Sequence, residues 1–319
     1  MHIEEAVSKI SYPNKNRLTP ECIEWIEEIS GNRVDKDGVK KLLGGTSSLV
    51  FEVPFENEGM QGNVILRLFH KKEWLAKEPD LARHEGESLR NAALAEIPTP
   101  ALIAFDEAGD KCGMPAVLMT KLPGSTILQP SDMKTWLDKM AAALAQIHQQ
   151  KTGSFQYEYF PYNDALRLEK PLWSKFQDDW LRAFFIVAGV RPPVEYCFIH
   201  RDYHPANVLW QDGELTGVVD WVNACRGPAG VDVGHCRVNL AQIFGVSTAD
   251  QFLAAYINHS GEAFRYDPYW DLVSLTDTLD GPPKVYAGWT ELGLEGLSDE
   301  LIRHRLDEYL LSLLERFDN

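Results

Sequence analysis

The segment FIHRDYHPANVLWQDGELTGVVDW, residues 198–221, constrains the fold more than any other part of this chain. Two apolar runs, 208–210 and 215–219, flank a turn that contains Asp-Gly. An Asp-Gly pair between two such runs indicates a β-hairpin. A hairpin returns the chain to its open end, so we expect Asn207, just before the first strand, to lie near Asp220, just after the second.

The side chains at this open end are rich in oxygen. Amide and carboxylate oxygens are hard ligands, and Mg²⁺ takes a few of them and completes its shell with water and phosphate oxygens. The spacing therefore predicts that Asn207 and Asp220 hold Mg²⁺ on the phosphates of ATP or GTP. Asp202 precedes the hairpin, where it can accept the proton of an attacking hydroxyl. Asp and Asn are also common in turns, but H-x-D-x-x-x-x-N, followed by an apolar hairpin and Asp, predicts a phosphotransferase.

This motif resembles that of the aminoglycoside phosphotransferase and choline kinase family, relatives of the protein kinases. The likeness rests on HRDYHPAN, residues 200–207, and on GPAGVD, residues 227–232. It implies an α+β, bilobal protein-kinase-like fold with a small strand-rich N-terminal lobe and a larger, mainly helical C-terminal lobe. It also implies that His200 and Asp232 support the catalytic loop structurally. A protein kinase is a weaker alternative, because Trp221 replaces the Phe that follows the metal-binding Asp there and no Ala-Pro-Glu ending follows.

A loop of small residues between two strand-like stretches is the expected phosphate-binding loop. It contains Gly-Gly followed by Thr46, Ser47 and Ser48. Small residues let backbone amides approach phosphate closely, and hydroxyls donate to it. A plain hairpin turn is the alternative for so short a sequence. The segment at Thr120 and Leu122 resembles the family's hinge, whose backbone groups bind a purine edge.

Arg67 lies inside an apolar run that is predicted to be a strand. In the resembled family this strand carries a lysine that grips the nucleotide phosphates, and Arg clamps phosphate through a planar fork of donors. On the next helix, expected over 79–94, Glu85 shares a face with Leu89 and is predicted to orient Arg67. Glu87 is the competitor for this role. The alternatives are an outward-facing Arg67 and solvated glutamates.

Three segments are expected along the chain. Residues 1–40 form a helical lead-in, 41–122 form the nucleotide-binding N-terminal lobe, and 123–319 form the catalytic and acceptor-binding C-terminal lobe. Apolar residues at helical spacing predict helices over 20–30, 133–149, 164–187 and 301–317.

Length and composition fit a globular protein. The chain has 319 residues, of which 45% are hydrophobic and 24% are charged, which suffices for a sizeable core. No apolar run approaches the roughly 18 residues of a membrane helix, and the acidic start MHIEEAVSKI lacks an apolar signal region. The five cysteines contain no C-x-x-C pair, so we expect reduced, mostly buried thiols in a cytoplasmic protein and no zinc site.

The charge distribution bears on the partner. The formal net charge is −16, of which residues 1–124 carry −5 and residues 125–319 carry −11. An acidic C-terminal lobe attracts a cationic acceptor such as an aminoglycoside or choline, although acidity also serves solubility. No basic patch stands out in the sequence, so nucleic acid is not an expected partner, and neither is a membrane.

The predicted function is transfer of a phosphoryl group from ATP or GTP to a hydroxyl of a small molecule. The acceptor is either an antibiotic, in a resistance role, or a metabolite. The alternative is a catalytically weak, kinase-like protein that binds nucleotide and acts through interactions. The arginine at position 67 and the sparse glycine loop favour this alternative, whereas the complete set of Asp202, Asn207 and Asp220 argues against it.

Overall fold

The structure, a computed structural model, divides into two compact units. It describes residues 17–42, 48–56, 62–150 and 152–318. The first unit consists of the chain up to Ala93 together with Thr99–Leu122. The second consists of Leu94–Pro98 and the chain from Pro123 onward.

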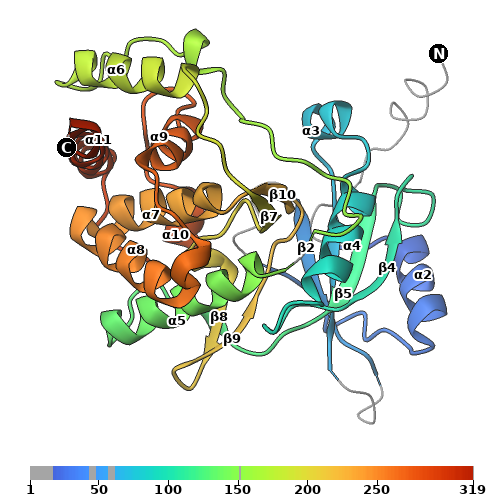
Figure 1. Cartoon of the computed structure of the whole chain (residues 1–319). Helices are drawn as coiled ribbons and strands as arrows, with labels where there is room; N and C mark the ends of the chain where they lie inside the picture. Colours follow the sequence, from blue (N-terminus) through green and yellow to red (C-terminus); the bar gives the residue numbers. More distant parts are fainter. Residues whose placement is uncertain (1–16, 43–47, 57–61, 151, 319) are drawn as a thin grey trace. The chain divides into compact units, whose positions relative to one another are not determined.

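An antiparallel five-stranded sheet forms the centre of the first unit, in the order β1-β2-β3-β5-β4; Figure 1 labels β2, β5 and β4 of this sheet. Every second residue of β2 is buried, as expected for a strand with one covered face. The register places Arg67 of β3 opposite residues of both neighbouring strands, β2 and β5. The strands are β1 (Lys40–Lys41), β2 (Leu49–Val53), β3 (Val64–Leu68), β4 (Leu102–Asp106) and β5 (Ala116–Thr120).

Helix α2 (Pro20–Ser30) packs into the core of this unit. It begins after Thr19, whose hydroxyl oxygen accepts a hydrogen bond from the backbone N–H of Cys22 at 3.3 Å. It ends at Gly31, whose φ of 67° lies in the left-handed region that favours glycine. Trp25 is buried in one cluster with residues of β2, β3 and β5. The helix expected within the first forty residues is therefore part of the first unit's core.

Two further helices, α3 (Lys72–Lys77) and α4 (Leu81–Ala92), follow β3. Helix α4 lies within the predicted range 79–94 and contacts β4 and β5. Its buried face includes Glu85 and Leu89, which are one helical turn apart.

A disulfide joins Cys22 of α2 to Cys112, which lies in the turn between β4 and β5. The expectation that all five cysteines are reduced is therefore wrong for this pair. Packing of α2 on the sheet brings together two residues that are 90 positions apart in the sequence. Cys197, Cys225 and Cys236 are free thiols. Burial raises the pKa of Cys197 and of Cys225 to about 12, so both are protonated at neutral pH.

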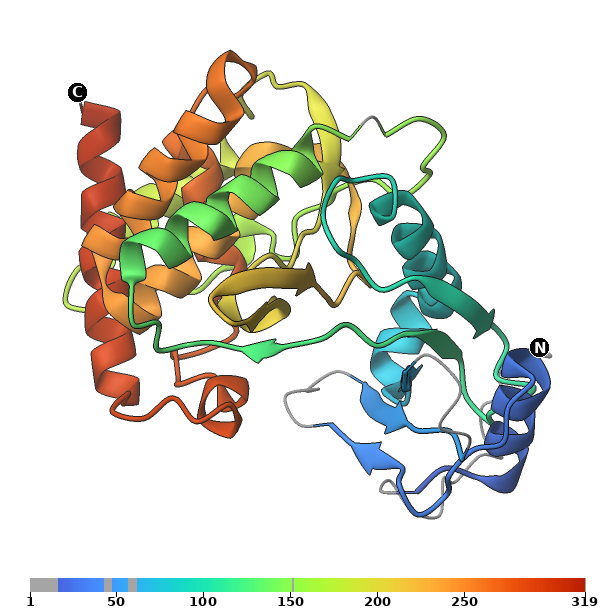
Figure 2. The same ribbon diagram turned by 90° about the horizontal axis from the view of Figure 1, so that it is seen from below.

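Helices make up most of the second unit (Figures 1 and 2). Helix α7 is central, because α8, α9 and α11 all pack against it and most of its side chains are buried. The helices are α5 (Met133–His148), α6 (Gln177–Ala188), α7 (Ala229–Phe244), α8 (Val246–Ser260), α9 (Pro268–Asp277), α10 (Ala287–Glu291) and α11 (Asp299–Asp318).

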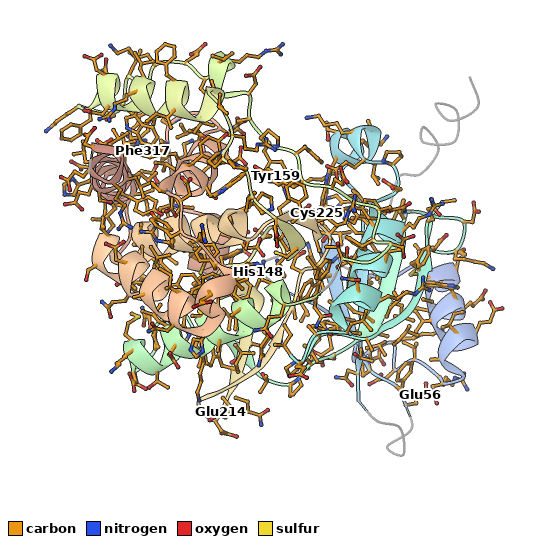
Figure 3. The ribbon with its side chains drawn as sticks, viewed as in Figure 1. Glu56, His148, Tyr159, Glu214, Cys225 and Phe317 are labelled. Carbon is orange, nitrogen blue, oxygen red and sulfur yellow. A yellow bond between two sulfur atoms is a disulfide. The ribbon has the colours of Figure 1, made fainter. Side chains whose placement is uncertain are left out.

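Two small antiparallel sheets complete the second unit. One pairs β7 (Tyr196–Ile199) with β10 (Cys225–Pro228), and the other has the order β6-β8-β9. Cys225 of β10 and Tyr159, both labelled in Figure 3, belong to a core cluster that includes residues of the first of these sheets. The predicted hairpin is formed by β8 (Val208–Gln211) and β9 (Glu214–Val218), and β6 (Ser125–Thr126) pairs with β8.

The single helix predicted over 164–187 is wrong. The structure has a short 3₁₀ turn, Ala165–Arg167, and α6 begins only at Gln177. Pro171 lies in the stretch between them, and a proline interrupts a helix because it lacks a backbone N–H and clashes with the preceding turn.

The strand-rich first unit and the mainly helical second unit confirm the predicted α+β, protein-kinase-like fold class. Within the described ranges, no helix has both the length and the apolar composition needed to cross a membrane.

Candidate active site

One buried carboxylate holds the loop between β7 and β8. Asp232, in the first turn of α7, accepts hydrogen bonds from the backbone N–H of His200 at 2.7 Å and of Arg201 at 2.6 Å. Burial would raise the pKa of Asp232, but the hydrogen bond from His148 and the charges of nearby histidines lower it, so the carboxylate is ionised. Through these hydrogen bonds Asp232 supports the loop structurally.

A chain of hydrogen bonds continues from Asp232 into the helices. His148, the last residue of α5 and labelled in Figure 3, donates from Nε2 to Asp232 Oδ2 at 3.1 Å. Because an ionised carboxylate only accepts, this nitrogen carries a proton. The hydroxyl of Tyr256 on α8 lies 2.6 Å from His148 Nδ1 and forms a hydrogen bond with it. Helices α5, α7 and α8 are therefore tied to the same carboxylate.

His200 links the loop to the end of β9. Its Nδ1 accepts a hydrogen bond from the backbone N–H of Asp202 at 3.2 Å, and its Nε2 donates to the carbonyl oxygen of Val219 at 2.9 Å. The ring also packs against Trp221, with 4.5 Å between ring centroids. The His200 side chain is fully buried and both ring nitrogens form hydrogen bonds, which is typical of a residue with a structural role.

Asp202 and Asn207 contact each other directly. The Asn207 amide donates from Nδ2 to the carbonyl oxygen of Asp202 at 2.9 Å and to Asp202 Oδ2 at 3.2 Å. Because the nitrogen is used in this way, the amide oxygen is the atom left for a cation. The backbone N–H of Val219 donates to the Asn207 carbonyl at 2.9 Å, so Asp220 follows at the open end of the hairpin. An amide oxygen and a carboxylate are donors that suit Mg²⁺.

Two residues of this region have left-handed backbones, with φ of 66° at Arg201 and 69° at Asp220. Such strain costs about 1–3 kcal/mol for a residue other than glycine and persists where the surroundings impose it. At Arg201 the constraints are the hydrogen bond to Asp232 and a guanidinium that donates to the Phe160 carbonyl and lies 3.9 Å from the Tyr162 ring centroid. Backbone strain concentrates at functional sites, which supports placing the site here.

Two histidines flank Asp202, and the sequence analysis missed both. His235 of α7 donates from Nε2 to Asp202 Oδ1 at 3.1 Å, and His204 Nε2 lies 3.7 Å from the same oxygen. The signal available in the sequence was helical spacing, because His235 follows Asp232 by three positions and shares its face of the helix.

The three side chains shift one another's acidity. Burial would raise the pKa of Asp202, but His204 and His235 lower it well below its ordinary value. Burial lowers the pKa of His204 to about 4, which leaves this imidazole neutral at pH 7. Burial would also lower the pKa of His235, but the hydrogen bond and the charge of Asp202 raise it.

In the first unit, Arg67 of β3 and Glu85 of α4 form a buried ion pair. Arg67 Nε lies 3.3 Å from Glu85 Oε1, and the two residues are 6% and 0% exposed. Glutamate is almost never fully buried unless it is paired, whereas Glu87 is only partly buried. The pair is the one that helical spacing predicted, and its role toward a nucleotide stays a prediction.

The other residues predicted to bind the nucleotide have different surroundings. Thr46 and Ser47 lie outside the described residues, and Ser48 is buried next to β2. Thr120 ends β5, and its hydroxyl oxygen accepts a backbone hydrogen bond from the residue before β4 at 2.8 Å. Leu122 is half-buried and is the last residue of the first unit.

Comparison with known sequences assigns the chain to a family. The profile of the phosphotransferase enzyme family matches residues 38–269. A homoserine kinase from Chelativorans sp. (strain BNC1) is 27% identical over 144 residues, which cover 40% of this chain and 42% of that protein. The chain therefore aligns with less than half of this curated relative's length.

Solved structures of small-molecule kinases share the fold. A thermostable mutant of aminoglycoside phosphotransferase APH(4)-Ia, in ternary complex with ADP and hygromycin B, has a TM-score of 0.61 at 16% identity, covering 91% of this chain and 98% of that chain. Amicoumacin kinase hAmiN, in complex with AMP-PNP, Ca²⁺ and Ami, has a TM-score of 0.59 at 13% identity, and the match covers 99% of this chain and 96% of that chain. Macrolide 2′-phosphotransferase MphH from Brachybacterium faecium has a TM-score of 0.54 at 18% identity, and the match covers 79% of this chain and 86% of that chain.

At these identities the structural likeness establishes the fold alone. The sequence profile covers well over half of the chain, and it includes the loop, the hairpin and the α7 carboxylate that the structure brings together. The chain belongs to the phosphotransferase enzyme family.

Proposed function

We propose that this protein transfers the γ-phosphoryl group of ATP or GTP to a hydroxyl group of a small molecule. The observation that carries the proposal is the contact between Asp202 and Asn207 at the open end of the hairpin that leads to Asp220. This contact places a carboxylate that can receive a proton next to oxygen atoms that can bind a cation. Phosphoryl transfer requires these groups and little covalent chemistry from the protein.

Asp202 orients the attacking hydroxyl and accepts its proton. The carboxylate is ionised at neutral pH, because His204 and His235 hold its pKa below the ordinary value in spite of burial. In a loose transition state most of the catalytic effect comes from positioning and from stabilising charge, and little covalent chemistry falls to the protein. Orientation is therefore the larger part of its contribution.

Asn207 and Asp220 would hold Mg²⁺, which when bound would neutralise the negative charge that develops during phosphoryl transfer. The Asn207 side chain is already fixed by its hydrogen bonds to Asp202, so its amide oxygen needs no reordering to receive the cation. A preorganised donor of this kind adds most to catalysis, because no energy is spent on orienting it during the reaction.

Residues of the first unit bind the nucleotide. Glu85 orients the Arg67 guanidinium, which contacts phosphate oxygens of the nucleotide. The loop hydroxyls, including that of Ser48, contribute further phosphate contacts. Backbone groups at Thr120 and Leu122 contact the purine edge. The support for these roles is the buried Arg67–Glu85 pair together with the family assignment.

The acceptor is a small molecule with a nucleophilic hydroxyl. The relatives' names point to an amino acid, homoserine, in one protein and to a macrolide in another, and one solved complex contains hygromycin B. The net charge of −11 over residues 125–319 favours a cationic acceptor for this chain, whether an antibiotic or a metabolite.

An acceptor panel tests the proposal. Purified protein is incubated with Mg²⁺, ATP or GTP, and one acceptor at a time, drawn from aminoglycosides, macrolides, choline and homoserine. We expect acceptor-stimulated release of ADP or GDP and a product whose mass is increased by one phosphoryl group. Asp178→Asn, at a 94% exposed side chain of α6, is the matched control and should keep full activity. Nucleotide binding without turnover on any acceptor would instead favour a protein that acts through interactions.

A further inference from the structure

Helix α7 reaches the catalytic loop with two side chains that are one turn apart. Asp232 accepts hydrogen bonds from the loop backbone, and His235 donates to the side chain of Asp202 at 3.1 Å. The first contact fixes where the loop lies. The second acts on the carboxylate itself, which the proposed function uses as the base.

The carboxylate of Asp202 is held at both oxygens by donors from different elements. Oδ1 accepts from His235 Nε2 of α7, and Oδ2 accepts from Asn207 Nδ2, beside β8. Two donors on opposite oxygens oppose rotation of the carboxylate plane about the Cβ–Cγ bond. Each carboxylate oxygen has about two lone-pair directions, and each of the two donors uses one of them. A further direction at a carboxylate oxygen can therefore accept the hydrogen bond of an acceptor hydroxyl.

Helix α7 is a rigid support for His235. A Cβ added at Gly230 would lie 2.6 Å from ring atoms of Trp270, and one added at Gly234 would lie 2.6 Å from Ser274 Oγ and 2.7 Å from the Trp270 carbonyl oxygen. The backbone of α7 therefore lies directly against α9 on either side of Asp232. A functional side chain placed on such a packed helix is held more closely than one on a loop.

Asp202, His204 and His235 also have the spacing of a metal site, because their ligand atoms lie within 4.8 Å of one another. The hydrogen bonds argue for donors instead. His204 Nδ1 accepts from the backbone N–H of Ala206, so the ring proton of the neutral imidazole is on Nε2, facing Asp202. A metal needs an unprotonated nitrogen at that position.

From this geometry we infer that His235 is a positioning residue, which fixes the orientation of the Asp202 carboxylate for attack by the acceptor hydroxyl. The inference rests on the proposed function, since it assigns Asp202 as the base. A carboxylate released on one side samples other orientations, and a misplacement of about 1 Å in a reacting group lowers turnover about 100-fold.

Two substitutions separate positioning from a merely structural role. His235→Leu removes the Nε2 donor, and we expect kcat to fall about 10- to 100-fold while the KM for nucleotide changes less than about two-fold. His235→Gln places an amide N–H near the position of Nε2 and should restore most of the lost kcat. His304→Gln, at an exposed side chain of α11, is the matched control and should leave kcat unchanged. Thermal unfolding of each variant checks the fold.

Equal losses in His235→Leu and His235→Gln, or an unchanged kcat in His235→Leu, would overturn the inference. Stoichiometric Zn²⁺ binding by the wild type that is lost in His235→Leu would overturn it in favour of a metal site.

A measurement without turnover keeps this inference separate from the proposed function. NMR titration of the His235 ring is expected to give a raised pKa in the wild type and a lower value in Asp202→Ala. Asp232 and Asp277 also raise the His235 pKa and remain in that variant, while His200 and His204 lie close to the same carboxylate. No change of pKa in Asp202→Ala refutes the contact, whatever the acceptor panel shows. A changed pKa together with no turnover on any acceptor refutes the proposed function and leaves the contact standing.

Discussion

Asp232→Asn is expected to damage the catalytic loop more than any surface substitution. The carboxylate is fully buried and accepts from the backbone N–H groups of His200 and Arg201 and from His148 Nε2. An Asn side chain offers one acceptor oxygen and turns an N–H₂ group toward a donor. The less costly orientation keeps the Asn oxygen at the position of Oδ2, where it still accepts from His200 and His148, and turns the N–H₂ group toward the Arg201 N–H. A hydrogen bond to a charged group contributes about 1.5–3 kcal/mol. Loss of the Arg201 bond, together with loss of the charge from the other two, predicts destabilisation by about 3–5 kcal/mol.

The left-handed backbone of Arg201 adds a functional consequence. Its N–H is the group that loses its acceptor, so its φ of 66° relaxes and the neighbouring Asp202 moves. Turnover should therefore fall by at least about 100-fold even in the fraction that stays folded.

Urea unfolding at pH 7, followed by circular dichroism, measures the stability term. The pH matters because the pKa of Asp232 is lowered in the folded protein. The contribution of Asp232 to the free energy of unfolding is present above its pKa in the unfolded chain, about 3.9. This contribution is lost as the pH falls through the lower pKa of the folded protein. Asp178→Asn serves as the surface control. A loss below about 1 kcal/mol for Asp232→Asn would refute the reasoning, because buried charge-assisted hydrogen bonds cannot contribute so little.

Three further outcomes are expected. Glu85→Gln weakens the hold on Arg67 and raises the Kd for nucleotide about ten-fold by calorimetry, since about 1.4 kcal/mol corresponds to ten-fold; an unchanged Kd contradicts the phosphate role. Arg237→Met lowers the free energy of unfolding by about 3–5 kcal/mol, because the buried Asp271 carboxylate loses the cation with which it is paired. A smaller loss in urea unfolding contradicts this role of the ion pair. Asp220→Asn raises the Mg²⁺ concentration for half-maximal turnover at least about ten-fold; an unchanged Mg²⁺ titration removes Asp220 from the metal site.

Local patterns explain what the sequence predicted well. The Asp-Gly turn between two apolar runs specifies the β8–β9 hairpin, and a hairpin requires Asn207 and Asp220 to lie at one end. Glu85 was distinguishable from Glu87 because a helix face repeats every three to four residues, and the buried face of α4 contains Glu85 and Leu89.

Long-range packing explains what the sequence did not predict. The Cys22–Cys112 disulfide depends on α2 packing on a sheet whose strands are far away in the sequence. The contact of His235 with Asp202 depends on the packing of α7 against the loop and β7, and in the sequence only the spacing from Asp232 indicated it. The break before α6 was visible in principle, because Pro171 cannot continue a helix, but the apolar residues on both sides suggested one periodic segment.

The most direct test of the central claim is acceptor-stimulated ADP or GDP formation in the presence of Mg²⁺, measured side by side for the wild type and Asp202→Ala. The account predicts turnover in the wild type and a fall of several orders of magnitude in the variant, with the fold and nucleotide binding retained. Near-normal turnover in a folded Asp202→Ala protein would contradict the assignment of Asp202 as the base and, with it, the proposed centre.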